Sequence, residues 1–190
     1  MPLIRTFIAV DVSPEVSSRI EELIGQLRSA DAKATWTKPG NMHLTLKFLG
    51  DTDEKRIPDV CRVVADVARQ ALPYQLRVHG VGAFPSVHRP RTVWVGVAEG
   101  EQEVCALADA VERALQAEGF PRETRQFSPH ITVGRVRERG AGQSELGDRI
   151  REMSDFEGGT TLIEEAVVYA SFLDPKGPTY KVLGRAPFAR

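Results

Sequence analysis

His43-Leu44-Thr45-Leu46 recurs later in the chain as His130-Ile131-Thr132-Val133, and this repeated tetrad decides how the rest of the sequence is interpreted. Each tetrad alternates a polar with an apolar residue, which is typical of a β-strand buried on one face only. Because successive side chains of a strand point to opposite faces, the histidine and the threonine of each tetrad share one face. The apolar face can pack into a core, which leaves the His/Thr face for function.

Around the tetrads, hydrophobic periodicity predicts the remaining helices and strands. Apolar residues recur at helical spacing in four segments: 14–27, 53–72, 101–118 and 146–153. Further strands are expected at 4–10, 33–37, 75–84, 92–97, 162–173 and 179–188. The glycine-rich, charged stretch 137–142 is expected to be a mobile loop. A proline-rich turn at 174–178 is expected to join the last two strands.

This mixture of hairpins and helical crossovers predicts an α+β fold in which helices cover one face of antiparallel sheets. The repeated tetrad suggests two similar halves. No stretch is rich enough in Gly, Ser or Pro to act as a linker, so we expect a single domain over residues 1–190.

Composition narrows the class of protein. The chain has 190 residues and a net charge of −1, so a polyanion would have to be held by a local patch. Cys61 and Cys105 have neither CxxC nor metal-ligand spacing and are expected to be free thiols of a reducing compartment. The sequence has no signal-peptide layout at its start and no apolar run of transmembrane length. We therefore expect a cytoplasmic protein that does not associate with membranes.

The paired tetrads have a specific chemical interpretation. Histidine gives or takes a proton near neutral pH, so two imidazoles facing one cleft can act as an acid and a base. Each threonine offers a hydroxyl that can hydrogen-bond an anionic oxygen. An anion that meets two imidazoles and two hydroxyls is most simply a phosphate or a phosphodiester.

Rival chemistries find less support. Metal ions favour compact groups of His, Cys, Asp and Glu, whereas the strand faces here supply threonine in place of carboxylates. The chain has no G-x-S-x-G nucleophile motif, no P-loop and no G-x-G-x-x-G dinucleotide motif. Neither a metal ion nor an organic cofactor is therefore expected.

The tetrads and their surroundings resemble the 2H phosphoesterases, and within them the RNA 2′,3′-cyclic phosphodiesterases, also called 2′-5′ RNA ligases. The resemblance covers nearly the whole chain, in the segments 5–9, 41–50, 84–91, 127–135 and 169–183. It implies two pseudo-symmetric lobes whose sheets face a central cleft, with helices on the outer faces and one tetrad from each lobe on the cleft floor.

The same resemblance implies a reaction: hydrolysis of a terminal 2′,3′-cyclic phosphate on RNA to a 2′-phosphomonoester, without metal. His130 would be the general base that deprotonates water, and His43 the general acid that protonates the leaving 3′-oxygen. Thr45 and Thr132 would hold the non-bridging phosphate oxygens. The implied partner is RNA with a cyclic phosphate end, including fragments of tRNA, and a monomer is expected.

Other residues are candidates for substrate contacts. By strict alternation Lys47 shares the face of His43, whereas Arg135 falls on the face opposite His130 unless the strand bulges at Gly134. Arg91 lies in a proline-flanked basic loop that could contact RNA phosphates. Aromatic residues that could stack on a terminal base are Phe7, Trp36, Phe48 and Phe127, of which Phe48 is expected in the core.

Two other functions stay open at this point. The cleft could belong to an RNA- or nucleotide-binding module without catalysis, although recognition alone needs Arg or Lys more than two imidazoles. The same site could also serve 2′-5′ RNA ligation or small cyclic nucleotides. Turnover of a 2′,3′-cyclic-phosphate-terminated oligonucleotide, compared with that of a mononucleotide, distinguishes these functions.

Overall fold

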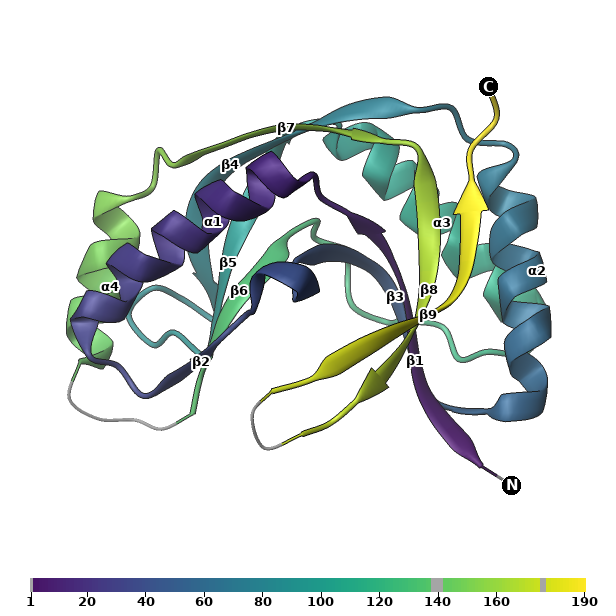
Figure 1. Ribbon diagram of the computed structural model, residues 1–190, viewed down its shortest axis with the longest axis horizontal. Helices are drawn as coiled ribbons and strands as arrows, with labels where there is room; N and C mark the ends of the chain where they lie inside the picture. Colours follow the sequence, from purple (N-terminus) through teal and green to yellow (C-terminus); the bar gives the residue numbers. More distant parts are fainter. Residues whose placement is uncertain (1, 138–141, 175–176) are drawn as a thin grey trace.

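Nine strands form one curved antiparallel sheet in the computed structural model, which describes residues 2–137, 142–174 and 177–190 (Figure 1). The strands are β1 (Leu3–Asp11), β2 (Ala34–Trp36), β3 (His43–Asp53), β4 (Tyr74–Phe84), β5 (Thr92–Glu99), β6 (Ile131–Val136), β7 (Glu157–Ile163), β8 (Glu165–Phe172) and β9 (Thr179–Pro187). Their order across the sheet is β7-β4-β5-β6-β3-β1-β8-β9, with β2 paired to β6.

This order divides the sheet into two matching lobes of four strands each. One lobe is β7-β4-β5-β6 and the other is β3-β1-β8-β9, so β6 and β3 meet in the middle. They are joined there by a single ladder pair, Leu44 opposite Ile131, which are the residues between the histidine and the threonine of each tetrad. The predicted α+β class with two pseudo-symmetric lobes is confirmed.

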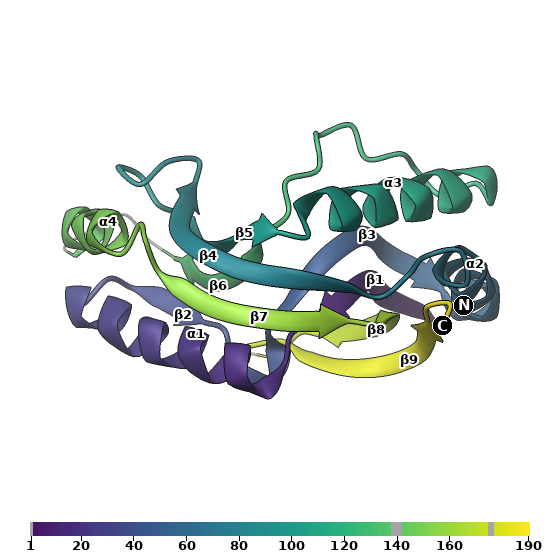
Figure 2. The same ribbon diagram turned by 90° about the horizontal axis from the view of Figure 1, so that it is seen from above.

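Four α-helices in the described residues cover the sheet: α1 (Pro14–Leu27), α2 (Ile57–Ala68), α3 (Glu101–Ala117) and α4 (Gln143–Glu152). Helices α1 and α4 lie at one end of the molecule and pack on β7 and β4, while α2 and α3 lie at the other end (Figures 1 and 2). There α2 packs on β8 and β9, and α3 packs on β3. Each lobe is therefore covered partly by a helix from the other half of the chain.

The amphipathic patterns explain why these helices pack as they do. The apolar stripes of α1 and α3 are buried against the sheet, in the residues Val16, Ile20, Leu23, Ile24, Leu27, Val104, Leu107, Ala108, Val111 and Leu115. Helix α1 begins where expected, because Ser13 accepts a hydrogen bond from the Val16 amide and Pro14 occupies the first turn. No helix in the described part of the chain is long and apolar enough to cross a membrane.

The predicted strand over 162–173 differs from the structure. The segment 162–173 was expected as one strand, but it is the end of β7 and the whole of β8, with the break at Glu164. Strand β7 pairs with β4 whereas β8 pairs with β1, so the chain changes lobes at this break. The expected mobile loop 137–142 and the turn 174–178 lie in part outside the described residues.

Candidate active site

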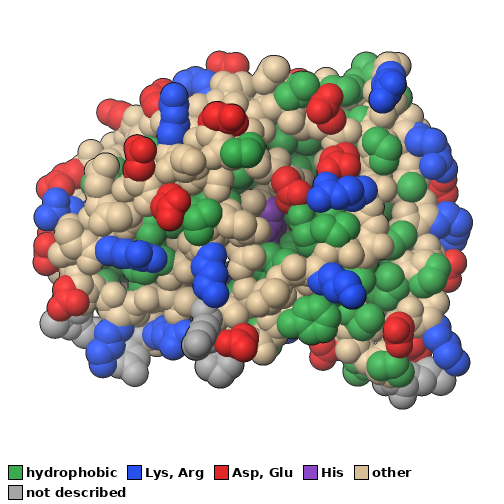
Figure 3. Space-filling model, viewed as in Figure 1, with side chains coloured by type: hydrophobic (Ala, Val, Ile, Leu, Met, Phe, Trp, Pro, Cys, Tyr) green, Lys and Arg blue, Asp and Glu red, His purple; other side chains and the backbone are tan. Residues whose placement is uncertain are grey.

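The two tetrads meet at the joint between the lobes and line one large cavity. The cavity has a volume of about 960 Å³ and is lined by the four tetrad residues predicted for the site, His43, Thr45, His130 and Thr132. Figure 3 shows a histidine at the bottom of a hollow near the centre of the molecule. The antiparallel register at Leu44 sets each histidine toward the threonine of the other strand, which gives the cavity floor a local two-fold arrangement.

The imidazoles are held in the same way on the two strands. Nδ1 of His43 lies 2.8 Å from the carbonyl oxygen of Asn41, and Nδ1 of His130 lies 2.7 Å from that of Ser128. A carbonyl only accepts hydrogen bonds, so each Nδ1 carries a proton and, in the neutral ring, Nε2 is the basic atom. Nε2 of His43 lies 3.0 Å from the hydroxyl oxygen of Thr45. Both rings are therefore oriented by the residue two positions upstream.

The two imidazoles differ in their surroundings. His43 is packed against three rings, those of Phe7, Tyr169 and Tyr180, and burial lowers its pKa to about 4. His130 meets the edge of Phe84 at 5.0 Å, and its pKa is lowered first by burial and further by the nearby Arg135 guanidinium. Both histidines are therefore neutral in the free protein at pH 7, and His43 holds a proton less readily in this state.

A bulge in β3 changes which residues face the cavity. Along the β1–β3 ladder Ala9 pairs with Thr45 and Ile8 pairs with Lys47, so Leu46 is an extra residue. The alternation reverses at that point. Lys47 turns to the opposite face from Thr45, and Phe48 joins the cavity face with an exposed fraction of 59%. The expectation that Phe48 is in the core is therefore wrong.

Lys47 is held away from the substrate space by partners of its own. Its ammonium donates to a carboxylate oxygen of Glu112 at 2.7 Å and to the carbonyl of Pro121 at 2.9 Å, and its side chain is only 2% exposed. The other carboxylate oxygen of Glu112 accepts the amide of Glu123 at 3.1 Å. Although Lys47 borders the cavity, its charge anchors the segment 121–123, and the predicted contact with an RNA phosphate is not supported.

The same bulge occurs in β6 and brings Arg135 to the site. Trp94 pairs with Thr132 and Val93 pairs with Gly134, so Val133 is the extra residue. Arg135 thereby returns to the face of Thr132, where it lines the cavity and donates to the Thr92 hydroxyl at 3.3 Å. Strict alternation would have placed Arg135 on the face opposite His130. The structure instead contains a bulge next to Gly134, which was the condition for Arg135 to reach the cavity.

The predicted stacking of a base on Phe7 is contradicted by the structure. Phe7 is only 2% exposed, because the rings of His43, Phe48, Tyr169 and Tyr180 surround it, so no base can stack on it. Its structural role is to support the His43 ring from a centroid distance of 4.8 Å. Arg91 is exposed and does not line the cavity, and its contact with an RNA phosphate stays a prediction.

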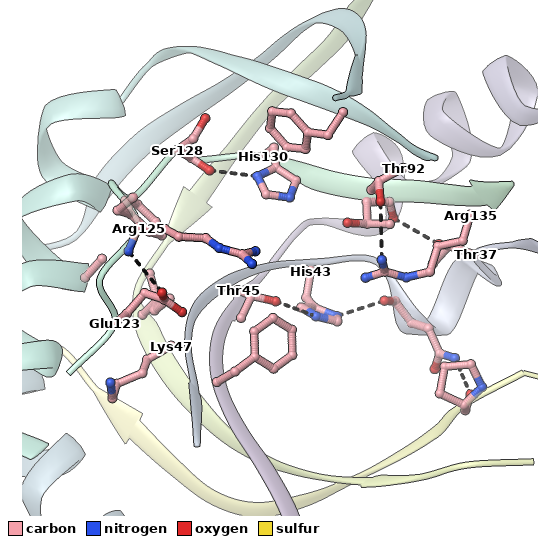
Figure 4. Close-up of a pocket in the computed structure, with 18 of the residues that line it drawn as sticks. Thr37, His43, Thr45, Lys47, Thr92, Glu123, Arg125, Ser128, His130 and Arg135 are labelled. Atoms are coloured by element: carbon pink, nitrogen blue, oxygen red, sulfur yellow. Dashed lines mark hydrogen bonds between the residues drawn. The ribbon is translucent and has the colours of Figure 1, made fainter. Parts of the chain in front are cut away.

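Two arginines that the sequence reasoning did not single out border the cavity. Arg122 and Arg125 belong to the irregular segment between α3 and β6 that Lys47 and Glu112 anchor. Figure 4 shows the side chains of Arg125 and Arg135 reaching into the space between the two imidazoles from opposite sides. The only signal in the sequence was their position just before the second tetrad. Trp36 and Phe127, named as stacking candidates, also line the cavity.

This arrangement suits an anionic substrate. Two imidazoles, two threonine hydroxyls and the guanidinium groups of Arg125 and Arg135 converge on one space, with apolar rings around it. Among the described residues, no group of three or more His, Cys, Asp or Glu side chains is placed to hold a metal ion. The hydroxyl and guanidinium groups can bind an anion, and the two imidazoles can transfer protons to and from it.

Comparison with known proteins agrees with this geometry. The model of the family described as LigT-like phosphoesterase matches the chain twice in tandem, over residues 10–94 and 95–180, and each match contains one tetrad. A Thermotoga maritima protein described as RNA 2′,3′-cyclic phosphodiesterase is 35% identical, covering 97% of this chain and 95% of its own. An Archaeoglobus fulgidus protein with the same description is also 35% identical, covering 94% and 97%.

Solved structures show the same fold. A Thermus thermophilus protein is similar with a TM-score of 0.80 and 28% identity, covering 97% of both chains. Escherichia coli LigT, in a crystal structure with 3′-AMP, is similar with a TM-score of 0.78 and 22% identity, covering 99% of both chains.

Proposed function

The chain belongs to the LigT-like phosphoesterase family, and on that premise we propose that it hydrolyses the terminal 2′,3′-cyclic phosphate of RNA to a 2′-phosphomonoester. One observation carries the proposal: both tetrads line a single cavity with their histidines oriented alike, in a chain 35% identical to a protein described as having this activity. The substrate partner is accordingly RNA with a cyclic phosphate end, and the chain acts as one bilobal unit, as a monomer in the cytoplasm.

The proposed chemistry uses one proton transfer at each histidine. Nε2 of His130 accepts a proton from a water molecule, whose oxygen attacks phosphorus. The bond from phosphorus to the ribose 3′-oxygen breaks, and the 3′-oxygen takes a proton from Nε2 of His43. Solvent then returns the pair to its starting protonation state. The assignment of base and acid follows the family resemblance.

Burial of His43 is compatible with a role as the acid. The pKa of its imidazole is about 4 in the free protein, so His43 would take up its proton together with the substrate. A phosphodiester anion in the cavity raises the pKa of an adjacent imidazole, because opposite charges favour the protonated form. Thr45 and Thr132 would hold the non-bridging oxygens, and Arg125 and Arg135 would balance the charge that builds up on them.

The test is turnover of an oligonucleotide that ends in a 2′,3′-cyclic phosphate, at neutral pH and in the presence of EDTA. Wild-type protein should hydrolyse it, and His43→Gln and His130→Gln should each lower kcat by about 10²–10⁴-fold with the thermal unfolding curve preserved. No turnover in EDTA would contradict the metal-free mechanism. Binding of the oligonucleotide without any turnover would favour a recognition module instead.

A further inference from the structure

A second groove lies beside the active cavity, at β2, the short strand that pairs with β6. Its volume is about 570 Å³, and its lining residues are Arg28, Lys33, Ala34, Thr35, Trp36 and Arg137. We call it the outer groove. Thr35 and Trp36 also line the active cavity, so the outer groove adjoins the cavity.

The fold places positive charge along the outer groove and beside it in the active cavity. Arg135 and Arg137 are two positions apart after the bulge in β6, and Arg135 lines the active cavity while Arg137 lines the outer groove. Thr35 of β2 pairs with Arg135, and the amide of Arg137 donates to the carbonyl of Lys33 at 2.8 Å. Arg28 approaches from the end of α1. Cations from three segments therefore lie along the outer groove and the adjoining wall of the active cavity.

The charge of the outer groove is unlike that of the rest of the surface. Three of its six lining residues are cationic and none is acidic, in a chain whose net charge is −1. Neither Arg28 nor Arg137 forms a salt bridge with another described residue. Surface arginines elsewhere commonly do: Arg62, Arg69, Arg77, Arg113, Arg149, Arg151 and Arg185 each face a carboxylate. Two exposed guanidinium groups without a described carboxylate partner suit an external anion.

Trp36 stands at the junction of the two spaces. It pairs with Gly134 across β2 and β6, and its ring lies over that glycine so closely that a Cβ there would come within 2.6 Å of Cε3. The indole is therefore held against the backbone and is only partly buried. An aromatic face fixed between two cationic spaces is a surface on which a base can stack.

We propose that the outer groove binds the sugar-phosphate backbone of the nucleotides that precede the cyclic phosphate, with Trp36 stacking on a base between them and the reacting end. This inference rests on the proposed function and defines its substrate class: an RNA chain end rather than a cyclic mononucleotide. Guanidinium groups bind phosphates without regard to base identity, so the groove adds affinity for length and not for sequence.

The experiment compares two substrates in two double variants. Arg28→Gln/Arg137→Gln removes the two arginine charges of the groove. Arg62→Gln/Arg69→Gln, the α2 variant, removes the same charge from α2 and its C-cap at the far end of the molecule. For an oligonucleotide with a 2′,3′-cyclic end, the groove variant should lose about tenfold in kcat/KM at low salt, whereas turnover of a cyclic mononucleotide stays within about twofold of wild type. The slope of log(kcat/KM) against log salt concentration is negative for a phosphate-binding site, and it should become shallower by about 0.7 for each lost phosphate contact.

Other results would overturn the inference. Equal losses in the groove variant and the α2 variant would show a general charge effect, and an equal loss with the mononucleotide would show damage to the active cavity. Failure of the proposed function is recognised separately, because the wild-type protein would then turn over neither substrate. In that case fluorescence anisotropy with an oligonucleotide that ends in a 2′-phosphate decides the matter. Binding weakened only in the groove variant supports the groove, and equal binding in both variants refutes it.

Discussion

Replacing Lys47 with methionine should destabilise the fold and weaken substrate binding while leaving the chemical step largely intact. The Lys47 side chain is 2% exposed and that of Glu112 is 18% exposed, so the variant leaves a mostly buried carboxylate without its cation. Removing one partner of a buried ion pair costs about 3–5 kcal/mol, and the residual exposure of Glu112 places the expected loss near the lower end, about 3 kcal/mol. For a chain of this size that corresponds to a fall in Tm of about 6–12 °C.

The variant also releases the segment that carries Arg122 and Arg125. Lys47 holds the Pro121 carbonyl, and Glu112 holds the Glu123 amide. We therefore expect KM for a cyclic-phosphate oligonucleotide to rise more than kcat falls. In the double variant Lys47→Met/Glu112→Leu no lone charge is left in the interior, so most of the lost stability should return while KM stays high.

Calorimetry and steady-state kinetics on the two variants test this reasoning. The alternative, that Lys47 contacts a substrate phosphate, predicts the reverse pattern: little change in Tm, a large rise in KM, and no recovery of stability in the double variant. Observing that pattern would refute the role assigned here to the Lys47–Glu112 pair.

Three further outcomes are expected. The pKa values of His43 and His130 are both lowered from the usual 6.5, so the form with one protonated histidine is most abundant below pH 6.5. We therefore expect kcat/KM to fall as pH rises through neutrality. A plateau up to about pH 8 would count against the two-histidine mechanism. His43 stays neutral in the folded state down to about pH 4, but it is protonated near pH 6.5 in the unfolded state. The free energy of unfolding should therefore fall by about 3 kcal/mol as pH drops from 6.5 to 4. In His43→Asn, chemical denaturation should show a smaller change of the free energy of unfolding over this pH range. Gly134→Ala should cost about 1–3 kcal/mol and alter Trp36 fluorescence, because the new methyl group meets the indole; an unchanged emission spectrum would show that the ring does not lie on the glycine.

The sequence predicted most elements and the four tetrad residues because both rest on local patterns. Each helix carries an apolar stripe that is complete within its own segment. Within each tetrad, the alternation of polar and apolar residues shows that the histidine and the threonine share one face. Strand β7 was missed for most of its length because Gly158 and Gly159 interrupt any alternation, so only its pairing with β4 defines it.

The misplaced faces of Lys47, Phe48 and Arg135 have one physical cause. Bulges at Leu46 and Val133 shift the strand phase by one residue, which moves Phe48 and Arg135 into the cavity and Lys47 out of its substrate space. Gly134 indicated a possible bulge in β6, but no residue type marks the bulge at Leu46, because it is fixed by the register with β1. Arg125 escaped notice for a related reason: its segment has no periodicity and is placed by contacts with Lys47 and Glu112.

The interleaving of the two lobes has a consequence for how this protein is made on the ribosome. The first tetrad is synthesised early, but β1 needs β8 as its neighbour, and the rings of Tyr169 and Tyr180 that enclose His43 come near the end of the chain. The His43 lobe therefore cannot be completed until almost all of the polypeptide has emerged. Long-range pairing of this kind slows folding and exposes unpaired strand edges during translation. A nascent chain stalled before β8 would carry both tetrads and still have no finished active site.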